Sequence, residues 1–328
     1  MDDFASAAMV RVLTHGMAAL GLEIPDAAAA SGDTPARIGL DLKRAVVESA
    51  IRQGGLACPP RLGRGVLAFA DDPTHRALTA ARDGIDLLER WCRLERYVHS
   101  EHRLELRTGG DGRADLRHVS LRPGHVPSAA EDLVVLGVLA ALLEAIGLEA
   151  VRATIDGNEV MGDGATQVLL RRLVETGRTG EWTLHWRSGP GRSEAAACAA
   201  RPAGPTGSAL TAPLDLCSTL PWPDAALRCA RDALSDPLRP RTLADAAAAL
   251  GLSARGLQRT LADAGLTWSG VQAQTRVRAA SWWLLETALP IAEIGFLSGY
   301  SDQPHFTREF GRRIGLPPGR YRVHFSRR

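Results

Sequence analysis

The chain has 328 residues, 45% of them hydrophobic and 23% charged, a composition typical of globular proteins with more than one domain. Its longest apolar run, 133–143, is too short to cross a membrane, and its acidic start lacks the features of a signal peptide, so we expect a cytoplasmic protein without a membrane segment. The five cysteines are scattered and form no Cys-x-x-Cys pair, which argues against a structural zinc site or a disulfide framework.

Charge is distributed unevenly along the chain. Residues 236–328 contain 13 Arg and 7 Asp or Glu, a net charge of +6, whereas residues 1–235 carry a net charge of −4. This asymmetry is typical of a basic module that binds a polyanion. Every basic residue except Lys43 is an arginine, whose planar guanidinium group can pair with guanine or with phosphate.

The first 200 residues begin with helical patterns. Apolar residues at helical spacing predict a helix over 2–21 and a second over 41–55. A third predicted helix starts after Thr74, as its N-cap, and runs through Trp91.

Strand patterns follow. Alternating residues on either side of a Gly-Gly-Asp-Gly turn predict a hairpin over 102–122, and further strands are predicted at 151–156 and 182–186. Between them, a capping box that starts at Ser128 predicts a helix ending at Gly147. We therefore expect an α/β domain over residues 1–215, in which Arg201–Pro213, rich in Gly, Pro and Ala, is a linker or a long loop.

The last 90 residues contain a repeated pattern. Residues 242–265 and 290–315 each predict a short apolar helix, a glycine turn, a serine N-cap (Ser253 or Ser301) and a second helix. Two helices across such a turn form a helix-turn-helix, whose second helix can enter the major groove of DNA. A connecting helix is predicted over 268–287.

Four motifs lie in this region: LSARGLQR (252–259), IAEIG (291–295), GYSDQPHFTREF (299–310) and GLPPGRYR (315–322). At these motifs the chain resembles the AraC/XylS family of bacterial transcription regulators. The resemblance implies an all-α DNA-binding domain over 224–328, in which a long helix holds two helix-turn-helix units. Residues 62–94 are similar, more loosely, to the regulatory domain of ornithine-utilisation-type regulators.

The repeat predicts two sets of DNA contacts. Base-edge contacts are expected from exposed residues of the two second helices: Arg255, Gln258, Arg259, Gln303, His305, Thr307 and Arg308. Phosphate contacts are expected from two hydroxyls and from the arginines at and beyond the end of the last helix-turn-helix: Ser253, Ser301, Arg312, Arg313, Arg320 and Arg322. No catalytic residue, metal ligand or cofactor is predicted.

The resemblance further implies promoter binding controlled by a small-molecule effector at the N-terminal domain, with homodimerisation as a second property. An activator of this kind would also contact RNA polymerase.

Two other interpretations are open. One is a ligand-independent oligomeric, architectural DNA-binding protein, and the other is an enzyme fused to a DNA-binding domain. The enzyme interpretation lacks a motif: Cys198 lies among alanines without the glycines of a nucleophile elbow. His99 and His102 have the spacing of metal ligands, but no third ligand is evident.

Overall fold

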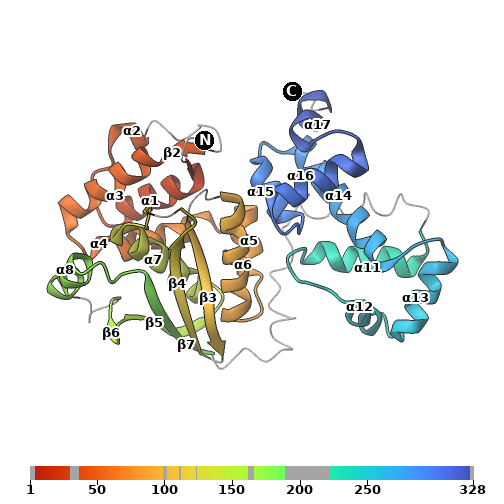
Figure 1. Cartoon of the computed structure of the whole chain (residues 1–328), viewed down its shortest axis with the longest axis horizontal. Helices are drawn as coiled ribbons and strands as arrows, with labels where there is room; N and C mark the ends of the chain where they lie inside the picture. The colour runs from red at the N-terminus through yellow and green to blue at the C-terminus, as the bar shows by residue number, and fades with distance from the viewer. Residues whose placement is uncertain are drawn as a thin grey trace. The chain divides into compact units, whose positions relative to one another are not determined.

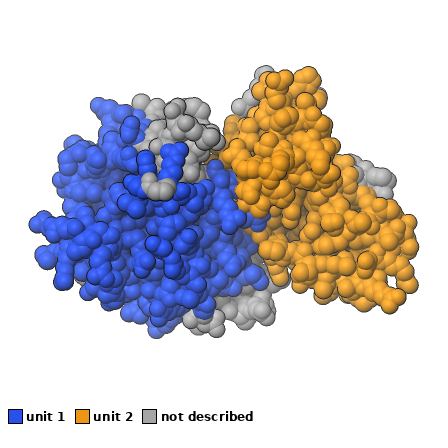
Figure 2. All heavy atoms as spheres, viewed as in Figure 1, with its two compact units in different colours: residues 1–199 blue, residues 200–328 orange. Residues whose placement is uncertain are grey.

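The computed structural model describes residues 4–29, 37–98, 102–110, 112–122, 124–161, 166–188 and 222–325. The chain divides into two compact units, Met1–Ala199 (unit 1) and Ala200–Arg328 (unit 2), which Figure 2 colours separately. The predicted linker Arg201–Pro213 lies outside the described residues, as do Cys198 and His99.

Unit 1 contains a five-stranded antiparallel sheet (Figure 1). Its strands, in spatial order, are β3 (His102–Gly110), β4 (Arg113–Ser120), β7 (Glu181–Ser188), β5 (Leu148–Ile155) and β6 (Asn158–Glu159). The predicted hairpin and the two other predicted strands are confirmed. Trp182, Leu184 and Trp186 are at most 6% exposed, because alternate residues of β7 point to the same, buried face.

The central helix of unit 1 is α7 (Ala129–Ala145). It begins at the predicted capping box, in which Ser128 accepts from the backbone of Glu131 and the Glu131 carboxylate accepts from the backbone of Ser128. It ends before Gly147, which has a φ of 81°. All residues from Glu131 to Leu143 are buried, so α7 is enclosed on every side rather than along one stripe.

Glycine permits the closest contact of α7. A Cβ at Gly137 would lie 1.8 Å from the carbonyl oxygen of Pro60, in the neighbouring helix α4 (Cys58–Leu62). The backbones of α4 and of the 3-10 helix η1 (Gly63–Phe69) thus pack directly on α7, while β5 contacts it as well.

The other elements of unit 1 are β1 (Phe4–Ser6), α1 (Ala7–Ala19), α2 (Asp26–Ala29), β2 (Arg37–Gly39), α3 (Leu40–Gly54), α5 (Pro73–Thr79), α6 (Gly84–Val98) and α8 (Gln167–Glu175). The predicted helix over 41–55 is confirmed as α3. The first helix begins at Ala7 and not at residue 2, because residues 4–6 pair with residues 37–39 in a two-stranded sheet.

The prediction of one continuous helix from Thr74 to Trp91 is wrong. Two short helices, α5 and α6, occupy this segment, and Asp72 rather than Thr74 is the N-cap of α5. A second aspartate, Asp83, accepts the backbone N–H of Asp86 at 2.8 Å and so favours a new helix start at Gly84.

Unit 2 is helical. Its elements are α11 (Asp224–Ser235), α12 (Leu243–Ala249), α13 (Ala254–Asp263), α14 (Trp268–Glu286), α15 (Ile291–Leu297), α16 (Gln303–Ile314) and α17 (Pro318–Phe325). The 19-residue α14 contacts α11, α15 and α17, and thus joins the first part of the unit to the last (Figure 1). Trp283, on α14, is 4% exposed and packs in the core.

Candidate nucleic-acid interface

The first helix pair of unit 2 consists of α12 and α13. Thr242 and Asp245 form a capping box at the start of α12. The turn between the helices passes through Gly251, whose φ of 69° suits glycine. Ser253 then caps α13 by accepting the backbone N–H of Gly256 at 3.0 Å, as predicted.

The second helix pair consists of α15 and α16, and its turn is one residue longer. The first helical residue follows the turn glycine by three positions in the first pair (251 to 254) and by four positions in the second (299 to 303). The prediction of Ser301 as N-cap is therefore wrong: Asp302 caps α16 and accepts the backbone N–H of His305 at 2.7 Å.

Helix α13 has a buried side and an exposed side. Leu257 and Leu261 are at most 1% exposed and pack in a core with residues of α11, α12 and α14. The three predicted base-contacting side chains, Arg255, Gln258 and Arg259, are exposed.

Helix α16 repeats this division. Phe306 and Phe310 are fully buried, and their rings lie 5.6 Å apart. Thr307 and Arg308 are exposed, whereas Gln303 and His305 are half-buried. Thr307 and Arg308 thus lie on the exposed side of α16, whereas Gln303 and His305, in its first turn, are partly covered.

An acidic residue that sequence reasoning missed lies among the arginines of α16. Glu309 Oε1 is 2.8 Å from Arg312 Nη2 and 2.5 Å from Arg313 Nε. Hydrogen bonds from Arg312, together with Arg313, lower the pKa of Glu309 to about 2. The spacings i,i+3 and i,i+4 on a helix are the signal that could have revealed this pairing.

The two predicted phosphate-contacting arginines of α17 differ in their surroundings. Arg320 is exposed. Arg322 donates from Nη2 to the carbonyl oxygen of Leu289 at 2.6 Å and from Nε to that of Leu284 at 3.2 Å. Because Leu284 lies in the last turn of α14, Arg322 satisfies one of the carbonyl groups that a helix end leaves free. A contact between Arg322 and a DNA phosphate stays a prediction.

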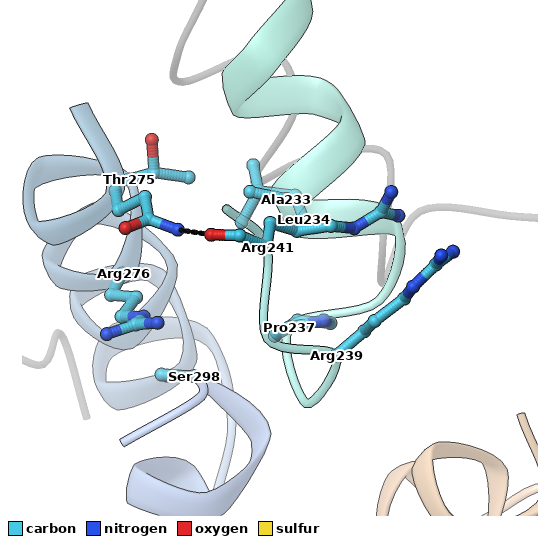
Figure 3. Close-up of a pocket in the computed structure, with 9 residues that line it drawn as sticks. Ala233, Leu234, Pro237, Arg239, Arg241, Thr275, Arg276 and Ser298 are labelled. Carbon is cyan, nitrogen blue, oxygen red and sulfur yellow. Dashed lines mark hydrogen bonds between the residues drawn. The ribbon is translucent and has the colours of Figure 1, made fainter. Parts of the chain in front are cut away.

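The loop between α11 and α12 lies against α14 (Figure 3). Gln272 on α14 donates to the carbonyl oxygen of Arg241 in this loop at 3.1 Å. In Figure 3 the side chains of Arg239 and Arg241 point away from α14. Together they line a small pocket with Ala233, Leu234, Pro237, Gln272, Thr275, Arg276 and Ser298. A Cβ at Gly299 would lie 2.4 Å from the carbonyl oxygen of Pro237, so the loop touches the second turn directly.

Unit 1 contains buried polar pairs between α7 and other elements. Lys43 Nζ is 3.0 Å from Glu131 Oε1, and both side chains are 3% exposed. His118 Nδ1 is 2.8 Å from Asp132 Oδ1, and Thr179 donates to Oδ2 of the same carboxylate at 2.6 Å. These pairs are satisfied internally, and no group of three or more His, Cys, Asp or Glu suited to a metal ion occurs within the described ranges.

A family model described as a helix-turn-helix domain matches residues 246–324, from within α12 to within α17. The transcriptional activator NphR of Rhodococcus sp. is 37% identical over 86 residues, 26% of this chain and 26% of the relative. The ornithine utilization regulator of Pseudomonas aeruginosa is 39% identical over 80 residues, 24% of each chain. The chain thus matches about a quarter of the length of these curated relatives.

Among solved structures, the transcriptional regulator CdpR of Pseudomonas aeruginosa aligns over 95% of this chain and 97% of its own, with 19% identity and a TM-score of 0.31. A score this low does not establish a shared fold for the whole chain.

Unit 2 therefore carries a helix-turn-helix DNA-binding domain. More narrowly, this segment belongs to the AraC-type helix-turn-helix domains, the family that its motifs resemble. Both curated relatives bear the names of regulators rather than of enzymes. In the part of the chain that the structure describes, no helix is both long and apolar enough to span a bilayer.

Proposed function

We propose that the chain is a sequence-specific, DNA-binding transcription regulator that uses both helix pairs as helix-turn-helix units. The observation that carries the proposal is the equivalence of α13 and α16. Each is a capped helix with buried apolar residues on one side, and Arg259 and Arg308 follow the buried Leu257 and Phe306 by two positions. Such a helix can place its outer side in the major groove.

The side chains expected to contact DNA divide into two roles. Those near the starts of α13 and α16 contact base edges: Arg255, Gln258, Arg259, Gln303, His305, Thr307 and Arg308. Arginine can donate two hydrogen bonds to guanine, and glutamine can pair with adenine. Phosphate contacts come from Ser253, Ser301, Arg312, Arg313, Arg320 and Arg322, and they supply affinity and register without reading sequence.

A genome-fragment selection with full-length protein tests this function. We expect one split motif, with a half for each helix-turn-helix unit. Failure to enrich any motif would contradict sequence-specific binding and favour an architectural DNA-binding protein.

A pair of arginine variants tests the division of roles. Arg308→Ala should weaken binding to the selected motif by roughly 1–3 kcal/mol and relax the preference at one base pair. Arg320→Ala should weaken binding to all sequences alike and reduce the dependence of affinity on salt. Affinity measurements on the motif and on scrambled DNA at several salt concentrations separate these outcomes. Equal, sequence-independent losses for both variants would contradict the base contact of Arg308.

Unit 1 has the role of an effector-binding and dimerisation domain in this proposal. Its separate core and its division from unit 2 support an independent regulatory domain. A ligand would shift the population of chains that can engage both halves of a promoter site, and an activator would then recruit RNA polymerase. Thermal unfolding against a metabolite panel tests this, because a ligand at 100 times its Kd stabilises by about 2.7 kcal/mol. If no metabolite shifts the transition and no dimer forms, unit 1 lacks this role.

A further inference from the structure

The second turn contains a chain of hydrogen bonds that the first turn lacks. Ser301 Oγ lies 3.3 Å from Asp302 Oδ2 and 2.9 Å from His305 Nδ1. The other carboxylate oxygen, Asp302 Oδ1, caps the helix. In α13 the third helical residue, equivalent to His305, is Gly256, so the first pair has no side chain to hold there.

These contacts determine which ring nitrogen of His305 carries the hydrogen. A carboxylate only accepts, so the hydroxyl of Ser301 must donate to Asp302. Because a hydroxyl has a single hydrogen, Ser301 Oγ can then only accept from His305 Nδ1. In a neutral imidazole the other nitrogen, Nε2, consequently keeps its lone pair and acts as an acceptor.

The Nε2 atom of His305 is open to a ligand. The imidazole is half-buried and lies edge-on to the ring of Tyr300, with the ring centres 5.5 Å apart. Within the described residues no hydrogen bond satisfies Nε2, and the atom is not enclosed. His305 belongs to the first turn of α16, the part of a recognition helix that contacts base edges.

We propose that Ser301 and Asp302 are positioning residues that make His305 a hydrogen-bond acceptor, and so select a base with an amino group in the major groove at one operator position. Those groups are N6 of adenine and N4 of cytosine, whereas guanine presents the acceptors N7 and O6. The inference rests on the proposed DNA-binding function. It also replaces the phosphate contact proposed above for Ser301, because the single hydroxyl hydrogen of Ser301 is donated to Asp302.

One substitution reverses the chain without removing the cap. In the Asp302→Asn variant, the amide oxygen still caps α16, because asparagine is as good an N-cap as aspartate. The amide NH₂ then faces Ser301 Oγ and donates to it, which leaves the hydroxyl hydrogen for His305 Nδ1. The ring hydrogen moves to Nε2, and His305 becomes a donor that suits guanine.

Nitrogen-15 NMR of histidine-labelled full-length protein at pH 8 tests the hydrogen position without DNA. His305 is assigned by its loss in His305→Gln. We expect the hydrogen on Nδ1 in the wild type and on Nε2 in Asp302→Asn. An unchanged hydrogen position between the two proteins, or Nε2–H in the wild type, overturns the proposal.

DNA selection at pH 8 tests the readout. At the position that His305→Gln affects, the wild type should prefer adenine or cytosine over guanine by roughly 3- to 10-fold, the range of one hydrogen bond, and Asp302→Asn should shift the preference toward guanine. As a control, Thr267→Asn exchanges the N-cap of α14, a residue with no proposed DNA contact, and should change no preference, because the third residue of α14 is Gly270, which offers no side chain. Binding with the same preference in wild type and Asp302→Asn overturns the inference but leaves the proposed function intact. If the wild type binds no DNA sequence preferentially, the proposed function itself is contradicted.

Discussion

At the scale of single residues, Glu309 reduces the positive charge of α16, a helix proposed to contact DNA. Its carboxylate pairs with Arg312 and Arg313, two of the residues expected to contact phosphates. An arginine held by a carboxylate must exchange that partner for a phosphate when DNA binds, so part of the attraction to DNA is offset.

We therefore expect Glu309→Gln to bind all DNA sequences more tightly and with a steeper dependence on salt. The substitution removes one negative charge and frees two guanidinium groups. Binding titrations on specific and scrambled DNA, between low and physiological salt, measure both effects. As a control, Glu286→Gln, at the end of α14, changes the net charge equally and leaves the pairs of Glu309 with these arginines in place. Equal gains in the two variants would mean that net charge, and not the local pairing, sets the affinity.

The two arginines of α17 permit a direct test of structural against DNA-binding roles. Arg322→Ala leaves the carbonyl groups of Leu284 and Leu289 without their donor and should destabilise unit 2 by about 1–3 kcal/mol. Arg320→Ala, at an exposed position two residues earlier, should change the stability by less than about 0.5 kcal/mol. Urea unfolding of the two variants measures the difference. Similar stability for both would contradict the capping role of Arg322.

At the scale of elements, the two turns have the same backbone requirement but different surroundings. Gly251 and Gly299 have φ angles of 69° and 80°, a region that side chains with a Cβ enter at a cost. A Cβ at Gly251 meets no atom within 4 Å, whereas a Cβ at Gly299 would be 2.4 Å from the Pro237 carbonyl oxygen. The second turn is therefore packed, and the first is open.

Gly251→Ala should cost roughly 1–2 kcal/mol from backbone strain alone. Gly299→Ala should cost more, because the Pro237 loop must also move, and overpacking adds about 1–3 kcal/mol. Thermal or urea unfolding compares the two, and DNA binding should follow the same order. Equal losses of stability in the two variants would show that the loop after α11 can move away from a Cβ at position 299 without a cost in free energy.

Local sequence signals predict most elements, and the mispredicted starts of α5, α6 and α16 share a cause: an aspartate favours the start of the helix. The capping box at Ser128 and the hairpin of β3 and β4 depend on contacts within a few residues, so local patterns are sufficient to predict them. The apolar spacing after Thr74 predicts one continuous helix, yet Asp72 and Asp83 each favour the start of a separate helix. Ser301 has the same spacing from the turn glycine as Ser253, which favours it as a cap, but the extra residue of the second turn makes Asp302 the N-cap.

At the scale of the whole molecule, unit 1 should lose stability in mild acid. Burial lowers the pKa of His75, and neither ring nitrogen has a hydrogen-bond partner within the described residues. Since the unfolded chain takes up this proton more readily, stability should fall as the pH falls through about 6.5, the ordinary pKa of histidine.

The urea midpoint of the wild type should therefore decrease between about pH 7.5 and pH 5.5. The decrease should be smaller in His75→Phe, whose ring cannot take up a proton. His15→Gln, at an exposed ring of the same unit, should behave like the wild type. If His75→Phe and the wild type show the same pH dependence, His75 does not contribute to it.

The sequence by itself determined the basic C-terminal domain, its AraC-type family and the exposed side chains that face away from its core. Those features depend on composition, on helical spacing and on motifs whose residues are close together in the chain. Only the tertiary structure decided the partners of residues that the fold brings together: Lys43 with Glu131, Arg322 with the end of α14, and the Pro237 carbonyl with the turn at Gly299. Lys43 and Glu131 are 88 residues apart in the chain, and Arg322 and Leu284 are 38 residues apart. A local sequence pattern does not specify which distant element will pack against it.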